Sequence, residues 1–496
     1  MGPKGMTTVG ATEDNRSAEI TCTKSQESSV IITDDEWLIS IANYKVDETT
    51  KKPQIEMVPS LLRSRKSYKS CFNPSVVSIG PYHHGKSEYR AFEKLKAPIA
   101  QKLCRLNLIS VERLYEEVAN VGKSARECYE KGWTDGYDDE FFNRMMFLDA
   151  CFVAHFLLIG VGYINPKVDG RQKEDGEQKE EDTRLEKSFY LVLRDLFLLE
   201  NQIPLQVLRA LMKSAFEMPN AGEDIIKEFL ELYTVMSPMR NSRSNAVNKF
   251  LAHMMGCSPK SDQEQKKREL DFVTGPHLLH LMREQLIQPV MHDFENLVTF
   301  FRKSKPNFRE SNIQESYRSV TDLKSAGIYF KPSQTGSCTD VKFTSRHIFG
   351  TLTIPPIKVD HLTKPLLLNL AAYEMCPLGP SEFCITSYIC LMDSLIDHAD
   401  DVKELRKKRI LINKLGSDEQ LAQLFNEIAN DLEPDPRAYA DARSKIDIHC
   451  KNKGHIWMAE WTHKYFSSPW ALLAFLGAIL ILALTLAQTY FTAYPR

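Results

Sequence analysis

The chain has 496 residues, of which 43% are hydrophobic and 26% are charged. These are ordinary values for a globular protein, and they provide material for a sizeable core. The formal net charge of −2 lacks the basic excess of a general nucleic-acid binder, so nucleic acid is not expected as a partner.

Eleven cysteines are scattered along the chain, from Cys22 to Cys450. They form no CxxC pair and none of the usual zinc-site spacings. The first thirty residues contain no apolar signal segment. We therefore expect reduced, mostly buried thiols in a cytosolic domain.

The first 33 residues are rich in Ser, Thr and charge, and we expect them to be disordered. Residues 34–466 are expected to form one helical domain, within which prolines and glycines mark an extended, turn-rich segment at 53–85. His83 and His84 lie in this segment. Adjacent side chains of an extended strand point to opposite faces, so ring packing is favoured over a shared metal ion.

A long apolar run, Met145–Gly162, is interrupted by Asp149 and His155. A mid-span aspartate costs about 2.5–3.5 kcal/mol on insertion into a membrane. The run is therefore predicted to be a buried helix of a globular core, and Asp138 and Asp139 are expected to cap its start.

The stretch Pro166–Lys187 mixes both signs of charge and is predicted to be a solvated loop. The helix expected next, around Leu185–Glu200, is apolar on nearly all sides and so belongs in the centre of the core. Pro204 ends it and starts a helix at Leu205–Ala215. The intervening Glu200–Gln202 can satisfy backbone groups freed at the break, although such a polar cluster could also line a pocket.

Histidines recur in the next helical stretch, Pro276–Phe301, where His277 and His280 are one turn apart and His292 follows. This spacing can hold a metal ion. Because no carboxylate or cysteine occupies a neighbouring ligand position, a structural role is favoured and no metal site is assigned.

A small β element is predicted over Val341–Val359, where Ile348, Leu352 and Ile354 partly alternate and Gly350 offers a turn. The segments that follow this β element are again expected to be helical.

The later helices begin after Leu362. Ser417 and Gln420 form a capping box, and the apolar residues that follow lie on one helical face. Pro434 and Pro436 are expected to end that helix.

The C-terminal segment Pro469–Phe491 contains no charged residue. As a helix of about 23 residues it reaches roughly 35 Å, which is enough to cross a hydrocarbon core of about 30 Å. Its many Leu, Ile and Phe residues favour insertion by roughly 3–6 kcal/mol, so we predict one transmembrane helix. The residues expected to mark this anchor are Pro469, Trp470, Leu476, Leu480, Leu484, Gln488, Tyr490 and Phe491.

Four lysines precede this segment (Lys445, Lys451, Lys453 and Lys464), whereas Arg496 alone follows it. By the positive-inside rule the large domain lies in the cytosol, with the chain held by a single-pass C-terminal anchor. Membrane lipid is thus an expected partner. The sequence does not distinguish the plasma membrane from an endomembrane.

Catalytic motifs are absent from the sequence: there is no GxxxxGK[ST], GxSxG, HExxH or GxGxxG. We therefore assign no catalytic or cofactor-binding residues, and we expect no cofactor.

Several segments resemble, in order, the blocks of the plant family catalogued as domain of unknown function 247. They are Val58–Arg63, Asn73–Gly85, Met145–Val153, Arg194–Leu208, Ser319–Lys331 and Leu352–Cys376. The resemblance covers nearly the whole chain from about residue 35, and SIGPYHHG and LLENQIP are its most specific motifs. Ala150 departs from the family's usual Gly, and Met375 from a frequent Gln.

The resemblance implies a mostly helical domain with a C-terminal membrane segment. It supplies no catalytic residues, because none are established for the family. Some grass members are associated with self-incompatibility as pollen-side recognition components. Recognition or signalling at a membrane is therefore the class of function that the resemblance implies.

The predicted fold class is mainly α: one large helical domain with a small β element near 341–359, plus one C-terminal transmembrane helix. Two functions remain open. The domain could present helical surfaces and the 166–187 loop to a protein partner, or it could be an enzyme with a polar pocket near SIGPYHHG and LLENQIP. Convergence of His83 or His84 with Glu200 beside an open cavity favours the enzyme, whereas a filled core and an exposed apolar patch favour the interaction protein. We favour the latter, because no motif supplies a nucleophile and its base.

Overall fold

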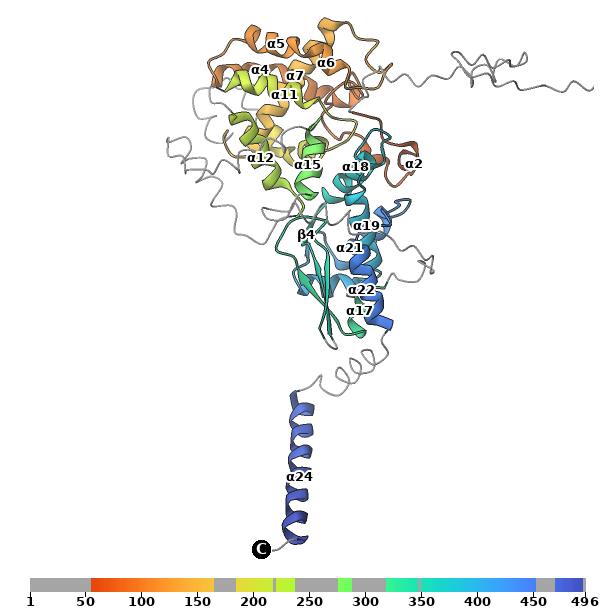
Figure 1. Cartoon of the computed structure of the whole chain (residues 1–496). Coiled ribbons are helices and arrows are strands. Elements are labelled where there is room, and N and C mark those ends of the chain that lie inside the picture. Colours follow the sequence, from red (N-terminus) through yellow and green to blue (C-terminus); the bar gives the residue numbers. More distant parts are fainter. Residues whose placement is uncertain are drawn as a thin grey trace, which may run out of the picture. The chain divides into compact units, whose positions relative to one another are not determined.

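The computed structural model describes residues 55–164, 184–216, 220–236, 275–287, 318–346, 349–451 and 469–493 (Figure 1). The protein is mainly helical with two small sheets, as predicted. The expected disordered segment 1–33, most of the charged loop 166–187, and His292 lie outside the described residues.

One group of helices packs around α7 (Asp139–Gly160). Its neighbours are α4 (Arg90–Leu106), α5 (Val111–Asn120), α6 (Gly122–Arg126), α11 (Leu205–Ala215) and α12 (Ala221–Tyr233). The Asp138 carboxylate caps α7 by accepting a hydrogen bond from the Phe141 amide at 2.7 Å. Most of α7 is buried, including Asp149, so the prediction of a core helix is confirmed.

The segment before this group contains short elements: α2 (Ser60–Arg63), α3 (Lys69–Phe72) and the 3₁₀ helix η1 (Ser87–Tyr89). Residues 73–86, between α3 and η1, have no regular secondary structure. This agrees with the extended, turn-rich segment that the prolines and glycines predict.

The helix predicted over Leu185–Glu200 is shorter in the structure, because α10 spans only Phe189–Asp195. After Asp195 the chain turns, and the Gln202 side chain donates to the carbonyls of Leu196 (2.7 Å) and Leu198 (2.8 Å). The apolar character of the segment reflects burial and does not mark where the helix ends. As predicted, α11 starts directly after Pro204.

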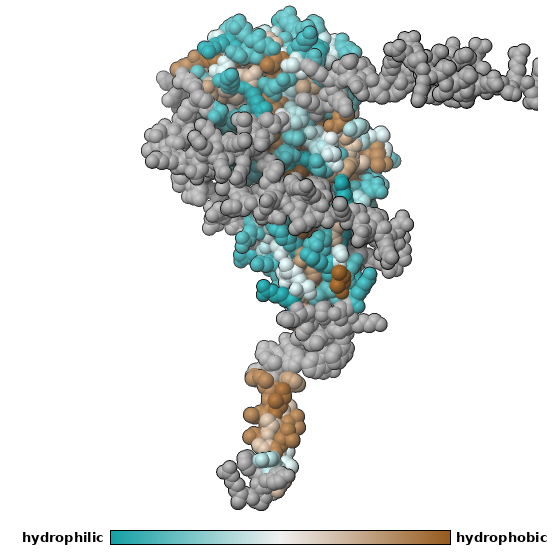
Figure 2. Space-filling model, in the orientation of Figure 1, coloured by the Kyte–Doolittle hydropathy of each residue, from teal (hydrophilic) through white to brown (hydrophobic). Residues whose placement is uncertain are grey.

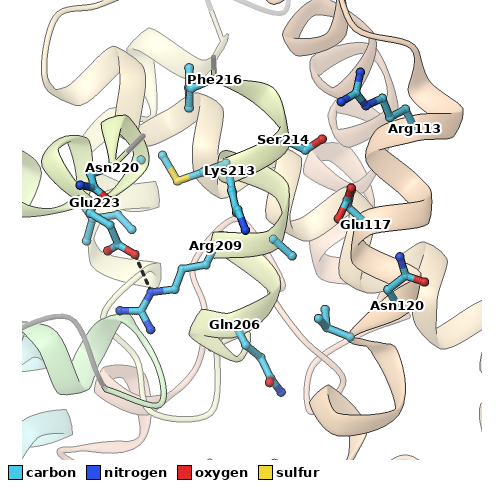
Figure 3. Close-up of a pocket in the computed structure, with 15 residues that line it drawn as sticks. Arg113, Glu117, Asn120, Gln206, Arg209, Lys213, Ser214, Phe216, Asn220 and Glu223 are labelled. Atoms are coloured by element: carbon cyan, nitrogen blue, oxygen red, sulfur yellow. Dashed lines mark hydrogen bonds and ion pairs between the residues drawn. The ribbon is translucent and has the colours of Figure 1, made fainter. Parts of the chain in front are cut away.

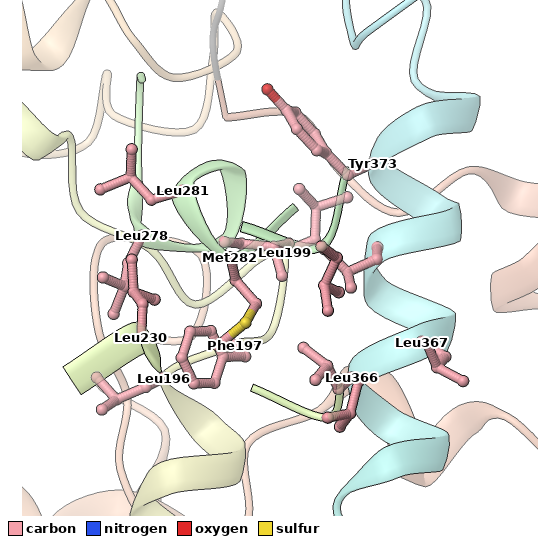
Figure 4. Close-up of a cluster of buried hydrophobic side chains, with 14 of the residues drawn as sticks. Leu196, Phe197, Leu199, Leu230, Leu278, Leu281, Met282, Leu366, Leu367 and Tyr373 are labelled. Atoms are coloured by element: carbon pink, nitrogen blue, oxygen red, sulfur yellow. The ribbon is translucent and has the colours of Figure 1, made fainter. Parts of the chain in front are cut away.

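A second group of helices surrounds α18 (Thr363–Met375). The helices α15 (Leu278–Ile287), α19 (Cys384–Leu395) and α21 (Asp418–Ile428) pack against α18, and α20 (Ala399–Lys407) packs against α21. Figure 4 shows how Leu199, which follows α10, lies among Leu278, Met282 and Leu366. The buried apolar residues of both groups belong to one core.

Two small sheets accompany the second group. In the first sheet, β3 lies between β1, to which it is parallel, and β2, to which it is antiparallel. In the second sheet, β4 and β5 are parallel. The strands are β1 (Ile328–Pro332), β2 (Lys342–Arg346), β3 (Phe349–Ile354), β4 (Ile357–Val359) and β5 (Leu411–Asn413). The helix α17 (Val320–Ser325) packs against β1, and α22 (Ala440–Lys451) packs against β2.

The predicted β element at 341–359 is confirmed, but the role given to Gly350 was wrong. Gly350 lies within β3 and pairs with both Ile328 and Ser345. A Cβ atom at this position would approach the Phe343 ring to 2.5 Å, so glycine is needed for close packing and not for a turn. Ile348 lies outside the described residues.

Two details of α21 differ from the expected capping box. The Ser417 hydroxyl accepts from the Gln420 amide as expected, but the Gln420 side chain accepts from the Gly416 amide instead of that of Ser417. The helix also ends at Ile428, before the prolines expected to end it, and Asp431 follows with a φ of +66°.

The C-terminal helix α24 spans Pro469–Ala493 and contains every residue expected to mark the anchor. It is long and apolar enough to cross a membrane, and its segment Leu473–Tyr490 has no buried residue. Figure 2 shows the apolar surface of α24 beside the mostly polar visible face of the domain.

The cysteines that the structure describes all carry free thiols. All but the half-buried Cys390 are buried. For this part of the chain, the prediction of reduced, mostly buried thiols is confirmed.

Candidate functional site

Residues 75–80, here called the strip, lead into the SIGPYHHG segment and are held by buried polar side chains. The Asp195 carboxylate accepts hydrogen bonds of 2.8–3.1 Å from three consecutive backbone amides, those of Ser75, Val76 and Val77. Burial raises the pKa of Asp195 to about 6, and the amide donors act in the opposite direction. This carboxylate therefore replaces the strand partner that the strip lacks.

Asn201 continues this support along the strip. Its Oδ1 accepts from the Ile79 amide at 2.7 Å, and its Nδ2 donates to the carbonyls of Val77 (3.1 Å) and Asp195 (2.9 Å). The polar residues of LLENQIP thus satisfy backbone groups at the break after α10 and in the strip. The architectural role predicted for them is confirmed.

A buried ion pair lies at the end of the strip, where Lys96 and Asp149 approach to 2.5 Å. Lys96 also donates to the Ser78 carbonyl (2.7 Å), and Asp149 accepts from the Gly80 amide (2.8 Å). Gly80 has a φ of +75°, and a Cβ there would lie 2.5 Å from the Gln202 carbonyl oxygen. Only glycine fits this approach.

His83 lies close to Glu200, which is one of the two observations that the enzyme hypothesis requires. Glu200 pairs with Arg63, accepts from the Val58 amide at 2.8 Å, and lies 3.4 Å from His83 Nε2. Burial and the charges of Lys86 and Arg63 lower the pKa of His83 to about 3, so this ring is neutral. Because Lys86 Nζ is 2.7 Å from Nδ1, the ring proton lies on Nε2 and faces Glu200.

The cavity beside Asn201 and Gln202 is too small for a substrate. A cavity of about 10 Å³ lies between Ile79, Val153 and Leu196, with Asn201 and Gln202 in its wall. That volume holds about one water molecule, whereas ligand sites span about 300–1,000 Å³. The polar side chains of LLENQIP therefore fix the strip to the core, and the cavity that borders Asn201 and Gln202 cannot hold a substrate.

The histidines of α15 also have structural partners. His280 Nδ1 lies 3.0 Å from the Tyr373 hydroxyl, and the His277 ring packs edge-on against the same tyrosine. Burial lowers the pKa of His280 to about 4, and the charge of Arg283 acts in the same direction. Within the described ranges, no group of three His, Cys, Asp or Glu side chains could hold a metal ion.

A set of partly exposed rings lies where the strip ends: His84, Trp133, Tyr137 and Phe141, here called the aromatic patch. Tyr137 and Phe141 stack at 5.2 Å, and His84 meets Phe141 edge-on at 5.5 Å. Trp133 joins this set through Tyr82, whose ring it meets edge-on at 5.2 Å. Trp133 and Phe141 each remain 44% exposed. The spacing of four residues between the last three rings is the signal in the sequence from which this patch could have been found.

Acidic side chains border the aromatic patch: Asp135, Asp138, Asp139 and Glu140 are all exposed. Arg126 pairs with Asp139 at 3.1 Å, and Arg144 pairs with Glu140. The Arg126 guanidinium also donates hydrogen bonds to the backbone carbonyls of Thr134 and Tyr137. The border therefore has more carboxylates than cations.

A larger cleft, of about 820 Å³, lies elsewhere, between α5, α11 and α12 (Figure 3). Its polar lining includes Arg113, Glu117, Arg209, Lys213 and Glu223. No pattern in the sequence indicates this cleft, because its lining residues come mainly from three separate helices.

Comparison with known proteins supports the motif resemblance. Two proteins of Arabidopsis thaliana named UPF0481 protein align with the chain. The first is 25% identical over 524 residues, which cover 92% of this chain and 94% of the relative. The second is 24% identical over 439 residues, which cover 86% and 82%. No solved structure matches the chain significantly.

The sequence profile of the domain of unknown function 247, described as "plant protein of unknown function", matches residues 55–484. Since the match spans the domain and most of α24, the chain belongs to this plant family.

Proposed function

We propose that this chain is a membrane-anchored recognition protein, held in the bilayer by α24 and binding a protein partner through its folded domain. The observation that carries the proposal is the contrast between two helices of membrane-spanning length. In α7, 78% of the most apolar stretch is buried in the domain, whereas in α24 none is. An apolar helix of this length that lacks a protein environment fits a lipid environment.

The charge distribution supports one orientation. Lys445, Lys451, Lys453 and Lys464 precede α24, and Arg496 alone follows it. The domain then faces the cytosol, and the chain crosses the membrane once. Recognition or signalling at a membrane is also the class implied by the grass members associated with self-incompatibility.

The aromatic patch supports a protein partner. Trp and Tyr are the residues most enriched at binding hot spots, and Trp133 and Phe141 expose nearly half of their surface. Exposed rings bordered by carboxylates suit the side chains of Arg and Lys, through cation–π contacts and charge attraction. We therefore propose a partner that presents basic residues. The contribution expected from the 166–187 loop stays a prediction.

The alternative of an enzyme has one favourable observation, the approach of His83 to Glu200. The cavity of about 10 Å³ that borders Asn201 and Gln202 leaves no room for a substrate at the LLENQIP break. Glu200 is moreover engaged by Arg63 and by the Val58 amide. The filled core and the exposed patch together favour the interaction protein.

Site-specific photocrosslinking in plant membranes tests this proposal. A photoreactive phenylalanine analogue is placed in the full chain at Phe141, and a matched control is placed at Leu108, which is 96% exposed and outside the patch. We expect a discrete partner adduct from position 141 alone, joined through a segment with Lys or Arg and lost in the Trp133→Ala background. Absence of an adduct from position 141, or the same adducts from both positions, contradicts the proposal.

A further inference from the structure

We infer that the cleft between α5, α11 and α12 binds a small organic anion, with a carboxylate or phosphate head on an apolar body. Its volume of about 820 Å³ lies within the range of small-molecule sites. It shares no lining residue with the aromatic patch or with α24. The inference is therefore independent of the proposed function.

Two cations without an ion pair in the described part of the chain line the cleft: Arg113 of α5 and Lys213 of α11. Figure 3 shows the Arg113 side chain directed from α5 towards α11, and the Lys213 side chain lying along α11 above Arg209. A ligand anion placed between them would form charge-assisted hydrogen bonds, the stronger class of such contacts.

Arg209 adds a third cation to the wall of the cleft. Its Nε donates to Glu223 at 2.8 Å, which fixes the guanidinium in place. Its Nη2 is buried and has no hydrogen-bond partner. Because Nη2 is buried in this structure, Arg209 contributes the charge of its guanidinium to the cleft wall and not a donor open to the ligand.

The charges of the lining favour an anion by a small margin. The cations are Arg113, Arg209 and Lys213, against the carboxylates Glu117 and Glu223. Because Glu223 is paired with Arg209, the unpaired groups are two cations and one carboxylate. Glu117 therefore opposes a bound anion, so its removal should strengthen binding.

The rest of the wall explains why the ligand needs an apolar body. Val121, Met212, Phe216 and Ile226 line the same cleft. Contact with these side chains buries apolar surface of the ligand, which contributes about 25 cal/mol per Å². A bare inorganic ion would gain none of this.

Calorimetric titration of the full chain in detergent tests the inference. The probes are phenyl phosphate and benzoate, with inorganic phosphate lacking the apolar body and benzyl alcohol lacking the charge. We expect both organic anions to bind, inorganic phosphate to bind more weakly, and benzyl alcohol not to bind measurably. Failure of both organic anions to bind at millimolar concentration overturns the inference.

Two variants of opposite effect place the binding in this cleft. Lys213→Met should weaken phenyl phosphate binding about tenfold or more, the size expected for a charge-assisted contact. Glu117→Gln should strengthen it a few-fold, and the exposed Lys66→Met, outside the cleft, should leave it unchanged. Equal affinity in the Lys213 variant and the parent, or weaker binding in the Glu117 variant, contradicts the assignment. Melting curves of each variant verify that it is folded.

Discussion

Asn201 links the strip to the core through hydrogen bonds that the local sequence pattern does not indicate. Its amide group makes three hydrogen bonds, to the backbone of Ile79, Val77 and Asp195. The role of the LLENQIP polar residues could be predicted, because polar side chains in an apolar run before Pro204 must satisfy the groups freed there. Their contacts with the strip could not, because those partners lie more than a hundred residues away in the sequence.

Replacing Asn201 should therefore destabilise the domain. Asn201→Leu removes the partners of the Ile79 amide and the Val77 carbonyl, and leaves the Asp195 carbonyl only its 3.4 Å bond from the Leu198 amide, so we expect the free energy of unfolding to fall by about 1–3 kcal/mol. Thermal or denaturant unfolding measures this. The matched control is Asn426→Leu, since Asn426 is exposed and makes one hydrogen bond of 3.3 Å. Equal stability of the two variants would show that Asn201 is not architectural.

Leu199 tests the packing at the same place. It is fully buried among side chains of α15 and α18 (Figure 4), as the apolar character of the Leu185–Glu200 segment predicts. Leu199→Ala should leave a cavity and lower the free energy of unfolding by about 2–5 kcal/mol. Leu108→Ala, at a 96% exposed position, serves as the control and should change little.

Because of His83, the free energy of unfolding is expected to depend on pH. Its folded-state pKa of about 3 lies below the usual 6.5, so protonation favours the unfolded chain. The stability that neutral His83 provides is present above about pH 6.5 and is lost as the pH falls towards 3. Between pH 6 and 4, we expect the parent to lose about 1.4 kcal/mol per pH unit more than His83→Gln. Denaturant melts across this range measure the difference. Parallel pH profiles for the two proteins would refute a buried neutral His83, and the exposed His361→Gln variant controls for the loss of a histidine.

Among the elements, those with strong end signals were predicted best. The caps of α7 and the proline before α11 mark their starts, and both helices begin where the sequence indicates. By contrast, α10 has no such signal at its end, and its predicted length was wrong. The strands β1 and β5 were missed because each is stabilised by a parallel partner from another part of the chain. Local alternation does not reveal such a pairing.

Gly350 provides a test at the level of the sheet. Because a Cβ there would approach Phe343 Cζ to 2.5 Å, Gly350→Ala should overpack the sheet and cost about 1–3 kcal/mol in unfolding free energy. Phe343→Leu removes the clashing ring, so the double variant should lose less than the two single losses added together. Strict additivity would argue against this contact.

At the scale of the whole molecule, α7 and α24 meet the same criterion of length and apolar character. In the sequence, Asp149 distinguishes the apolar run of α7 from that of α24, and the structure shows the physical reason. Asp149 is paired with Lys96 of α4 and bound to the Gly80 amide, which a lipid environment could not provide. The sequence therefore predicted that α7 is buried in the core and that α24 is not. The 820 Å³ cleft arises only when α5, α11 and α12 come together, so no segment of the sequence could indicate it.

The central claim is that α24 alone holds this domain at a membrane, and carbonate extraction of fractionated cells tests it most directly. The full chain is compared with a variant that lacks residues 468–496, and with a soluble reporter carrying those residues at its C-terminus. We expect the full chain and the reporter fusion in the carbonate-resistant pellet, and the truncated domain in the soluble fraction, folded and with an unchanged melting temperature. A truncated domain that remains in the pellet would contradict the account, as would a full chain released by carbonate.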